Sequence, residues 1–168
     1  MKKFIFPIIM MGVAGCGKSS VGALLAAKIG VNFIDGDDLH PQGNIDKMAA
    51  GTPLTDEDRW GWLDKVADTA RNHTQLVISC PALKRVYRER LRQKIERPVQ
   101  FVFLDISQET SLERLKHRKQ HFMPVSLVES QFNILERPDD EADVRTIRSI
   151  GQTDNIAKFV DLIRQCLH

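Results

Sequence analysis

The sequence has few cysteines, and their arrangement indicates neither a disulfide framework nor a zinc site. Three occur in 168 residues, at Cys16, Cys80 and Cys166, and no two form a CxxC pair. An odd number without such pairs argues against both kinds of structure. A reducing cytoplasm is the compartment that fits this usage best.

The sequence also lacks an excess of charge of either sign. Lys and Arg total 24, Asp and Glu total 22, and the net charge is +2. This balance excludes a polybasic nucleic-acid binder and an acidic tail. With 42% hydrophobic residues and no repeat or Gly/Ser linker, residues 1–168 are expected to form one globular domain.

Long apolar runs are missing as well. The uncharged segment 4–17 ends at Lys18 and is too short to span a bilayer, so we expect no membrane partner. Two lysines, an apolar run and small residues before Cys16 also fit a bacterial lipoprotein signal. Residues 1–15 therefore have two interpretations, a buried first strand or an export signal.

Several motifs of other enzyme classes are absent. There is no NKxD, HExxH or GxSxG, which disfavours a GTPase switch, a zinc protease and a serine hydrolase. His117 and His121 have i, i+4 spacing but no third metal ligand accompanies them.

Apolar runs alternate with helical patterns along the chain. The runs cover residues 4–11, 33–35, 76–80, 99–104 and 144–150, and the helical patterns cover 19–29, 56–72, 82–94, 107–118, 125–136 and 155–167. This alternation predicts an α/β fold with a parallel sheet covered by helices on both faces. Residues 116–124 are predicted to be a mobile insert and 138–143 an exposed acidic loop.

Residues 12–19, GVAGCGKS, match the phosphate-binding pattern GxxxxGK[ST] between an apolar run and a helix. In this context, backbone N–H groups and the helix N-terminus bind phosphate, Lys18 reaches the β- and γ-phosphates, and Ser19 binds Mg²⁺. Cys16 is a candidate reactive thiol, although a backbone role is the simpler expectation. The residues expected to contact ATP are Gly12, Val13, Ala14, Gly15, Cys16, Gly17, Lys18, Ser19 and Ser20.

The segment FIDGDDLH at 33–40 is the candidate acceptor side of the site. Ligands of such folds bind beyond the carboxyl ends of the strands, where the phosphate loop also lies. Asp35 could hold Mg²⁺ through water, and Asp37 could take the proton of an attacking hydroxyl. A solvated acidic turn is the alternative.

Several basic side chains could bind an anionic acceptor or the transferring phosphate. Lys84 is favoured because it lies near a strand-to-helix junction, and Arg114 and Arg118 are spaced four residues apart, as a lid would need. The full set is Arg59, Lys84, Arg85, Arg88, Arg114, His117, Arg118 and His121.

Together these stretches resemble the gluconokinase family. The matching segments are GVAGCGKS, FIDGDDLHP, NIDKM, GTPLTDEDR, ALKRVYRERLR, HFMP and SQFNILERP, spanning residues 12–138. The resemblance implies the fold of nucleoside monophosphate and shikimate kinases: a P-loop NTPase with three layers, a five-stranded parallel sheet and a mobile lid at about residues 114–130. It also implies transfer of the ATP γ-phosphate to the 6-hydroxyl of D-gluconate, and a homodimer.

The resemblance also implies roles for individual residues. Lys18, Asp37 and Arg118 would be catalytic, and Ser19 and Asp35 would hold Mg²⁺. Arg114 would lie near adenine. The residues implied in binding gluconate are Asp37, His40, Arg59, Lys84, Arg88 and His121.

Pro81 departs from the family pattern, in which serine is common at this position. A proline would start the following helix and remove a hydroxyl that could touch substrate. Two alternatives therefore stay open: a kinase for another small anionic polyol such as shikimate, and a nucleotide-binding protein without transfer activity.

Overall fold

A computed structural model describes residues 6–117, 124–148, 160, 161, 163 and 165. The predicted roles of Arg118 and His121 fall outside this part of the chain. The lid predicted at about residues 114–130 is described only at its two ends, which lie in helices α5 (Gln108–Lys116) and α6 (Val125–Ile134). Within the described part, no helix is both long and apolar enough to cross a membrane.

Five parallel strands form one sheet in the order β2-β3-β1-β4-β5. They are β1 (Ile8–Met11), β2 (Asn32–Asp35), β3 (Leu76–Ser79), β4 (Gln100–Asp105) and β5 (Val144–Arg148). The five-stranded parallel sheet predicted from the sequence is thereby confirmed. Cleavage before Cys16 would remove β1 from the centre of the sheet, so the structure favours the buried strand over the export signal.

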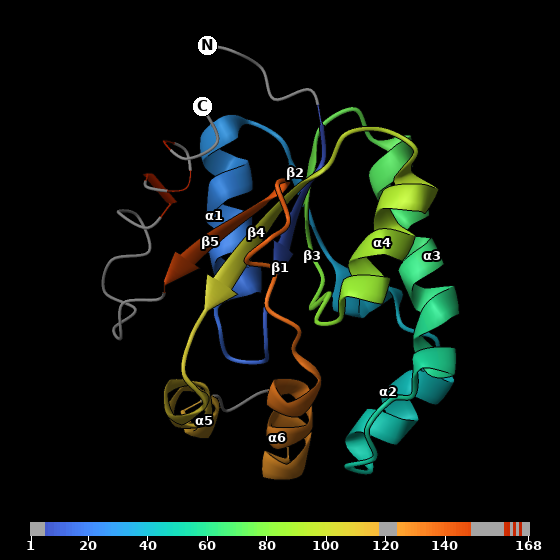
Figure 1. Ribbon diagram of the computed structural model, residues 1–168, viewed down its shortest axis with the longest axis vertical. Helices are drawn as coiled ribbons and strands as arrows, with labels where there is room; N and C mark the ends of the chain where they lie inside the picture. Colours follow the sequence, from blue (N-terminus) through green and yellow to red (C-terminus); the bar gives the residue numbers. More distant parts are fainter. Residues whose placement is uncertain (1–5, 118–123, 149–159, 162, 164, 166–168) are drawn as a thin grey trace.

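Helices cover both faces of the sheet, as Figure 1 shows. Ile8 and Met10 of β1 pack on the side of α1 (Lys18–Ile29). Ile9 and Met11 pack on the opposite side, against α3 (Asp56–Asn72) and α4 (Arg85–Ile95). Because β1 is buried on both faces, its sequence is a continuous apolar run and not an alternating one.

The remaining elements lie at the carboxyl ends of the strands, toward the bottom of Figure 1. These are α5, α6, the short 3₁₀ helix η1 (Gly36–Leu39) and α2 (Gln42–Ala49). The sequence patterns predicted neither η1 nor α2. The loop between β1 and α1 opens at this same end, so the strand topology brings it toward residues 35–40.

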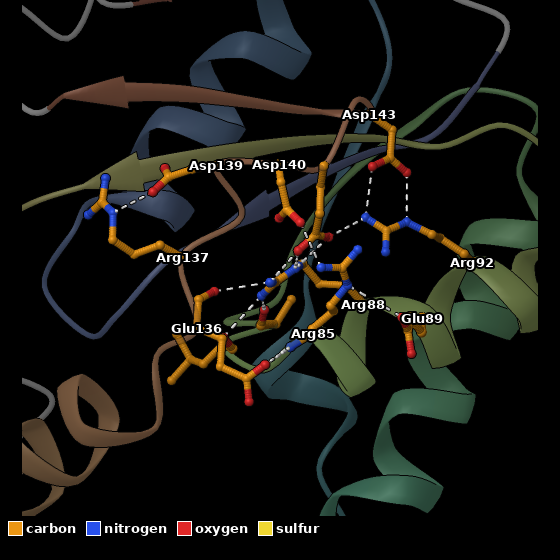
Figure 2. Close-up of polar contacts among 12 residues, drawn as sticks. Arg85, Arg88, Glu89, Arg92, Glu136, Arg137, Asp139, Asp140 and Asp143 are labelled. Atoms are coloured by element: carbon orange, nitrogen blue, oxygen red, sulfur yellow. Dashed lines mark hydrogen bonds and ion pairs between the residues drawn. The ribbon is translucent and has the colours of Figure 1, made fainter.

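Two local predictions need correction. The first is the exposed acidic loop at 138–143. The segment is a loop and Asp139 and Asp140 are exposed, but the side chain of Glu141 is only 3% exposed and is paired with Arg88 and Arg92. Figure 2 shows Arg85, Arg88 and Arg92 of α4 facing this loop. Burial alone raises the pKa of Glu141, but hydrogen bonds from Arg88 and Arg92 outweigh it and bring the pKa to about 2.

The second is the start of the helix after β3. Pro81 does not begin it, because α4 starts at Arg85 with Lys84 as its N-cap residue. Pro81 instead lies in the irregular connection between β3 and α4, where its carbonyl accepts the N–H of Gly12 at 3.2 Å. The segment around Pro81 is therefore joined to the phosphate loop.

Candidate active site

The loop between β1 and α1 leaves backbone donors open at the start of the helix. Gly17 is the N-cap in a left-handed conformation, φ 92°, and no side chain caps this end. The first helical hydrogen bond runs from the Val21 N–H to the Gly17 carbonyl, at 2.8 Å. The N–H groups of Lys18, Ser19 and Ser20 thus have no helical partner and, with the positive end of the helix dipole, favour an anion.

Other donors of the loop are already engaged within the chain. The Gly12 N–H binds Pro81, the Cys16 N–H donates to Val13 O at 3.2 Å, and the Ala14 N–H donates to Gln131 Oε1 at 2.7 Å. The Cys16 side chain is buried. These contacts fix the shape of the loop and leave the helix start to face a phosphate.

A carboxylate lies directly beside the loop. Asp35 ends β2 and accepts the Ser19 hydroxyl at 3.1 Å through Oδ2, while the Ser79 hydroxyl reaches Oδ1 at 3.0 Å. The Asp37 N–H also donates to Asp35 Oδ1, at 3.0 Å. The predicted metal pair, Ser19 and Asp35, is therefore assembled from two different elements. Carboxylate and hydroxyl oxygens are the ligands that Mg²⁺ prefers.

The turn after β2 requires glycine because it passes close to β3. A Cβ atom on Gly36 would lie 2.1 Å from the Ser79 carbonyl oxygen, so a side chain cannot be accommodated. The Trp62 indole N–H donates to the Gly36 carbonyl at 2.8 Å and fixes the same turn from α3. This close packing places Asp37 at the strand end with a side chain that is 60% exposed.

His40 lies next to Asp37 and is held in a fixed orientation. Its ring stacks on Trp62 with 4.0 Å between the ring centroids, and Asn44 Nδ2 donates to its Nδ1 at 3.2 Å. The Nε2 atom is 3.9 Å from Asp37 Oδ1. Burial lowers the pKa of His40, which favours the neutral ring.

A second polar cluster lies between the start of α3 and the start of α4. Lys84 Nζ is 3.1 Å from Asp56 Oδ1, the Tyr87 hydroxyl binds the same carboxylate, and Arg59 donates to the Tyr87 hydroxyl at 2.9 Å. The hydrogen bond from Tyr87, with help from Lys84, lowers the pKa of Asp56. The structure thus brings the predicted residues Arg59 and Lys84 onto one tyrosine, where both cations also face its ring.

Arg88 does not belong to this cluster, and its predicted contact with substrate is wrong. The side chain is completely buried. Its Nε and Nη2 bind Glu141, Nη1 binds the carbonyls of Ala82 and Leu83, and Nη2 also binds the carbonyl of Glu136. Every N–H donor of the guanidinium is used, so Arg88 stabilises the fold around the site.

Arg114 reaches the phosphate loop from α5. Its Nη1 donates to the carbonyls of Gly15 and Cys16, at 3.2 and 3.3 Å. This contact places a cation beside the loop, and the predicted contact with adenine stays a prediction. His117 follows directly after α5 and is exposed.

Three residues of the site were not predicted from the sequence. Ser79 holds Asp35, Asp56 holds Lys84, and Gln131 binds the Ala14 N–H. Asp56 and Gln131 lie in segments that resemble the gluconokinase family, and Ser79 lies in a predicted strand. Only the strand order brings Ser79 beside Asp35, which it faces directly in the β2–β3 register.

The chain is similar to known proteins over most of its length. The profile of the family described as "AAA domain" matches residues 8–137. The thermosensitive gluconokinase of Escherichia coli (strain K12) is 45% identical over 164 residues, which cover 95% of this chain and 86% of the relative.

Solved structures show the same relationship. A gluconokinase from Sinorhizobium meliloti 1021 has a TM-score of 0.83 and 39% identity, covering 99% of this chain and all of that one (100%). A shikimate kinase from Acinetobacter baumannii, solved in complex with shikimate, has a TM-score of 0.64 at 16% identity and covers 98% of this chain and 94% of that one, which shows the fold alone.

Proposed function

The chain belongs to the gluconokinase family, and from this premise we propose that it transfers the γ-phosphate of ATP to the 6-hydroxyl of D-gluconate, giving 6-phospho-D-gluconate and ADP. The observation that carries the proposal is the contact network from Ser19 through Asp35 to Asp37. It joins the helix that follows the phosphate loop to a carboxylate at the acceptor side.

The loop supplies the groups that bind the nucleotide. The open N–H groups of Lys18, Ser19 and Ser20 would bind phosphate oxygens, with the helix dipole adding to the attraction. Within the described residues, the Lys18 ammonium forms no ion pair, so it is available to the β- and γ-phosphates. Lys18 would stabilise the charge that develops on the transferring group.

Ser19 and Asp35 fit Mg²⁺ as a further component. The Ser19 hydroxyl donates a hydrogen bond to Asp35, which leaves the lone pairs of the Ser19 oxygen available as a hard ligand. Asp35, already oriented by Ser79, would hold the ion through water. When bound, Mg²⁺ supplies positive charge that neutralises the phosphate oxygens.

Asp37 is the proposed general base. Its backbone is fixed by Asp35, and its largely exposed carboxylate is free to accept the proton of a substrate hydroxyl. The neutral ring of His40, with Nε2 near Asp37, would bind a hydroxyl of the same substrate.

Arg59 and Lys84 are the proposed partners of the gluconate carboxylate. Both are held near Tyr87, and Lys84 is kept in place by Asp56. Two cations in one cluster suit a carboxylate. The carboxylate of shikimate or of a sugar acid other than gluconate would compete for the same two cations. The roles of Arg118 and His121, the homodimer and the cytoplasmic location stay predictions from the sequence.

An acceptor panel tests the proposed function. Purified protein with Mg²⁺ and ATP is assayed for ADP release without acceptor, then with D-gluconate, shikimate and several other sugar acids. Selective stimulation by D-gluconate is expected. Nucleotide binding without stimulation by any acceptor would contradict the proposal, and stimulation by a different acid would reassign the substrate.

A further inference from the structure

Helix α6 is hydrogen-bonded to the phosphate loop through Gln131. Gln131 Oε1 accepts the Ala14 N–H at 2.7 Å, and the buried Ser111 hydroxyl of α5 donates to the Ala14 carbonyl at 2.5 Å. Both backbone polar groups of Ala14 are therefore held by helices far away in the sequence.

The residues that follow α6 hold the segment that carries Lys84. The Glu136 N–H donates to the Leu83 carbonyl at 2.9 Å, and Glu136 Oε2 accepts the Arg85 N–H at 3.1 Å. Lys84, the N-cap residue of α4, lies between these two anchored residues and has no side-chain cap of its own. Glu136 thus caps α4 from a distance, and Figure 2 shows it beside Arg85.

The buried Arg88 strengthens this attachment. Its Nη1 binds the carbonyls of Ala82 and Leu83, and its Nη2 binds the carbonyl of Glu136 at 3.0 Å. The ion pair with Glu141 keeps the guanidinium in place. The segment before α4 and the segment after α6 consequently share one buried cation.

One more hydrogen bond connects residues 81–85 back to the phosphate loop. The Pro81 carbonyl accepts the N–H of Gly12, the first residue of the phosphate loop. The loop, α6, residues 135–136 and residues 81–85 therefore form a ring of hydrogen bonds. A shift at one point of such a ring strains the contacts at the others.

We propose that Gln131 and Glu136 are positioning residues that couple the nucleotide half of the site to the acceptor half through α6. Gln131 holds the phosphate loop in its binding shape, and Glu136 holds Lys84 toward the acceptor. The inference deepens the proposed function, on which its acceptor half rests. A ligand that orders its own half of the site lowers the cost of ordering the other half, so ATP and D-gluconate should each increase the affinity for the other. The two factors should be equal, since such coupling is reciprocal.

The test measures binding at equilibrium in intact protein. A non-hydrolysable ATP analogue and D-gluconate are each titrated alone and in the presence of the other, and melting temperatures are recorded. The variants are Gln131→Met, which removes the acceptor for the Ala14 N–H, and Glu136→Ala, which removes the cap of α4. Glu136→Gln keeps an oxygen acceptor, and Asn133→Ala changes an exposed residue of the same helix.

Gln131→Met is expected to weaken binding of the ATP analogue about fivefold, and Glu136→Ala to weaken binding of D-gluconate about fivefold. In both variants, the factor by which each ligand raises the affinity for the other should fall close to one. Glu136→Gln and Asn133→Ala should behave like the wild type. These shifts in affinity are the readout that a merely structural role would not produce.

Two results would overturn the inference. One is a wild-type protein in which neither ligand affects the other. The second is a lower melting temperature in Gln131→Met and Glu136→Ala with unchanged affinities and unchanged enhancement. If the wild type bound nucleotide but no D-gluconate, the proposed function would fail. The effect of Gln131→Met on nucleotide binding would still decide whether Gln131 positions the phosphate loop.

Discussion

At the scale of single residues, the site depends on how one carboxylate orients another. Asp35 accepts the hydroxyls of Ser19 and Ser79 and the N–H of Asp37. With these donors, Asp35 is a fixed anion beside the loop, while Asp37 keeps a largely exposed carboxylate. Two neighbouring aspartates thus have different surroundings, which suit the two different roles proposed for them.

Asp37→Asn should lower kcat by about a hundredfold or more, because an amide cannot accept the hydroxyl proton. The affinity for a non-hydrolysable ATP analogue should stay close to that of the wild type. Steady-state kinetics with D-gluconate and a binding titration check the two expectations. A collapse of ATP affinity with the same change would instead make Asp37 a nucleotide or metal residue.

Sequence patterns could name candidate site residues but not the partners of those residues. The motif made Lys18 and Ser19 clear candidates because their spacing alone carries the chemistry. The role of Arg88 was mistaken because the sequence of a basic helix is the same whether its arginine binds substrate or a buried carboxylate. Its partner Glu141 stands in an acidic run typical of a solvated loop, and only the fold brings the two together.

At the scale of elements, α4 is attached to the rest of the protein through its arginines. Arg88 and Arg92 both bind Glu141, and Arg92 also binds Asp143. These contacts hold the segment before β5 against the helix, next to the start of α4 where Lys84 lies. Removing one member of a buried ion pair leaves the other charge without compensation.

Glu141→Gln should therefore destabilise the protein by about 3–5 kcal/mol at neutral pH, as measured by urea unfolding. The folded pKa of Glu141 lies at about 2, below its ordinary value of 4.5. The stabilisation by the carboxylate is consequently complete at a pH above the ordinary pKa and is lost as the pH falls through the pKa of the folded state. The difference between wild type and variant should shrink over that window.

Glu89→Gln is the matched control for this experiment. Glu89 also pairs with an arginine of α4, at 3.5 Å from Arg85, but its side chain is 52% exposed. Exposed pairs of this kind contribute little to stability. An equal loss in both variants, or a loss in Glu141→Gln that did not depend on pH, would contradict the assignment of a buried ion pair.

Element boundaries were predictable where burial is continuous and less so where ends are fixed by distant contacts. The strands β1, β3 and β4 are buried on both faces, so each is visible as an apolar run. Helix α2 was missed because it is only eight residues long and its three apolar residues, Ile45, Met48 and Ala49, are too few to define a helical pattern. Helix α6 ends before its predicted limit because residues 135–136 extend toward α4.

At the scale of the whole molecule, both halves of the site lie at the carboxyl end of one parallel sheet. The phosphate loop follows the central strand β1, and Asp37 follows the edge strand β2, with β3 between them. Binding of a nucleotide to the folded state alone should raise the stability of the entire domain.

Saturation with a non-hydrolysable ATP analogue at about a hundred times its dissociation constant should stabilise the protein by about 2.7 kcal/mol. A melting curve with and without the analogue measures this shift. Lys18→Ala should reduce the shift at the same concentration, because it removes the positive charge that faces the phosphates. An undiminished shift in the variant would remove Lys18 from the nucleotide site.

Transfer of phosphate to the 6-hydroxyl of D-gluconate can be observed by ³¹P NMR of the reaction with Mg²⁺ and ATP. One new phosphomonoester signal, coupled to the two protons on C6, should grow together with ADP. Release of inorganic phosphate alone, or an ester at another carbon, would contradict this transfer.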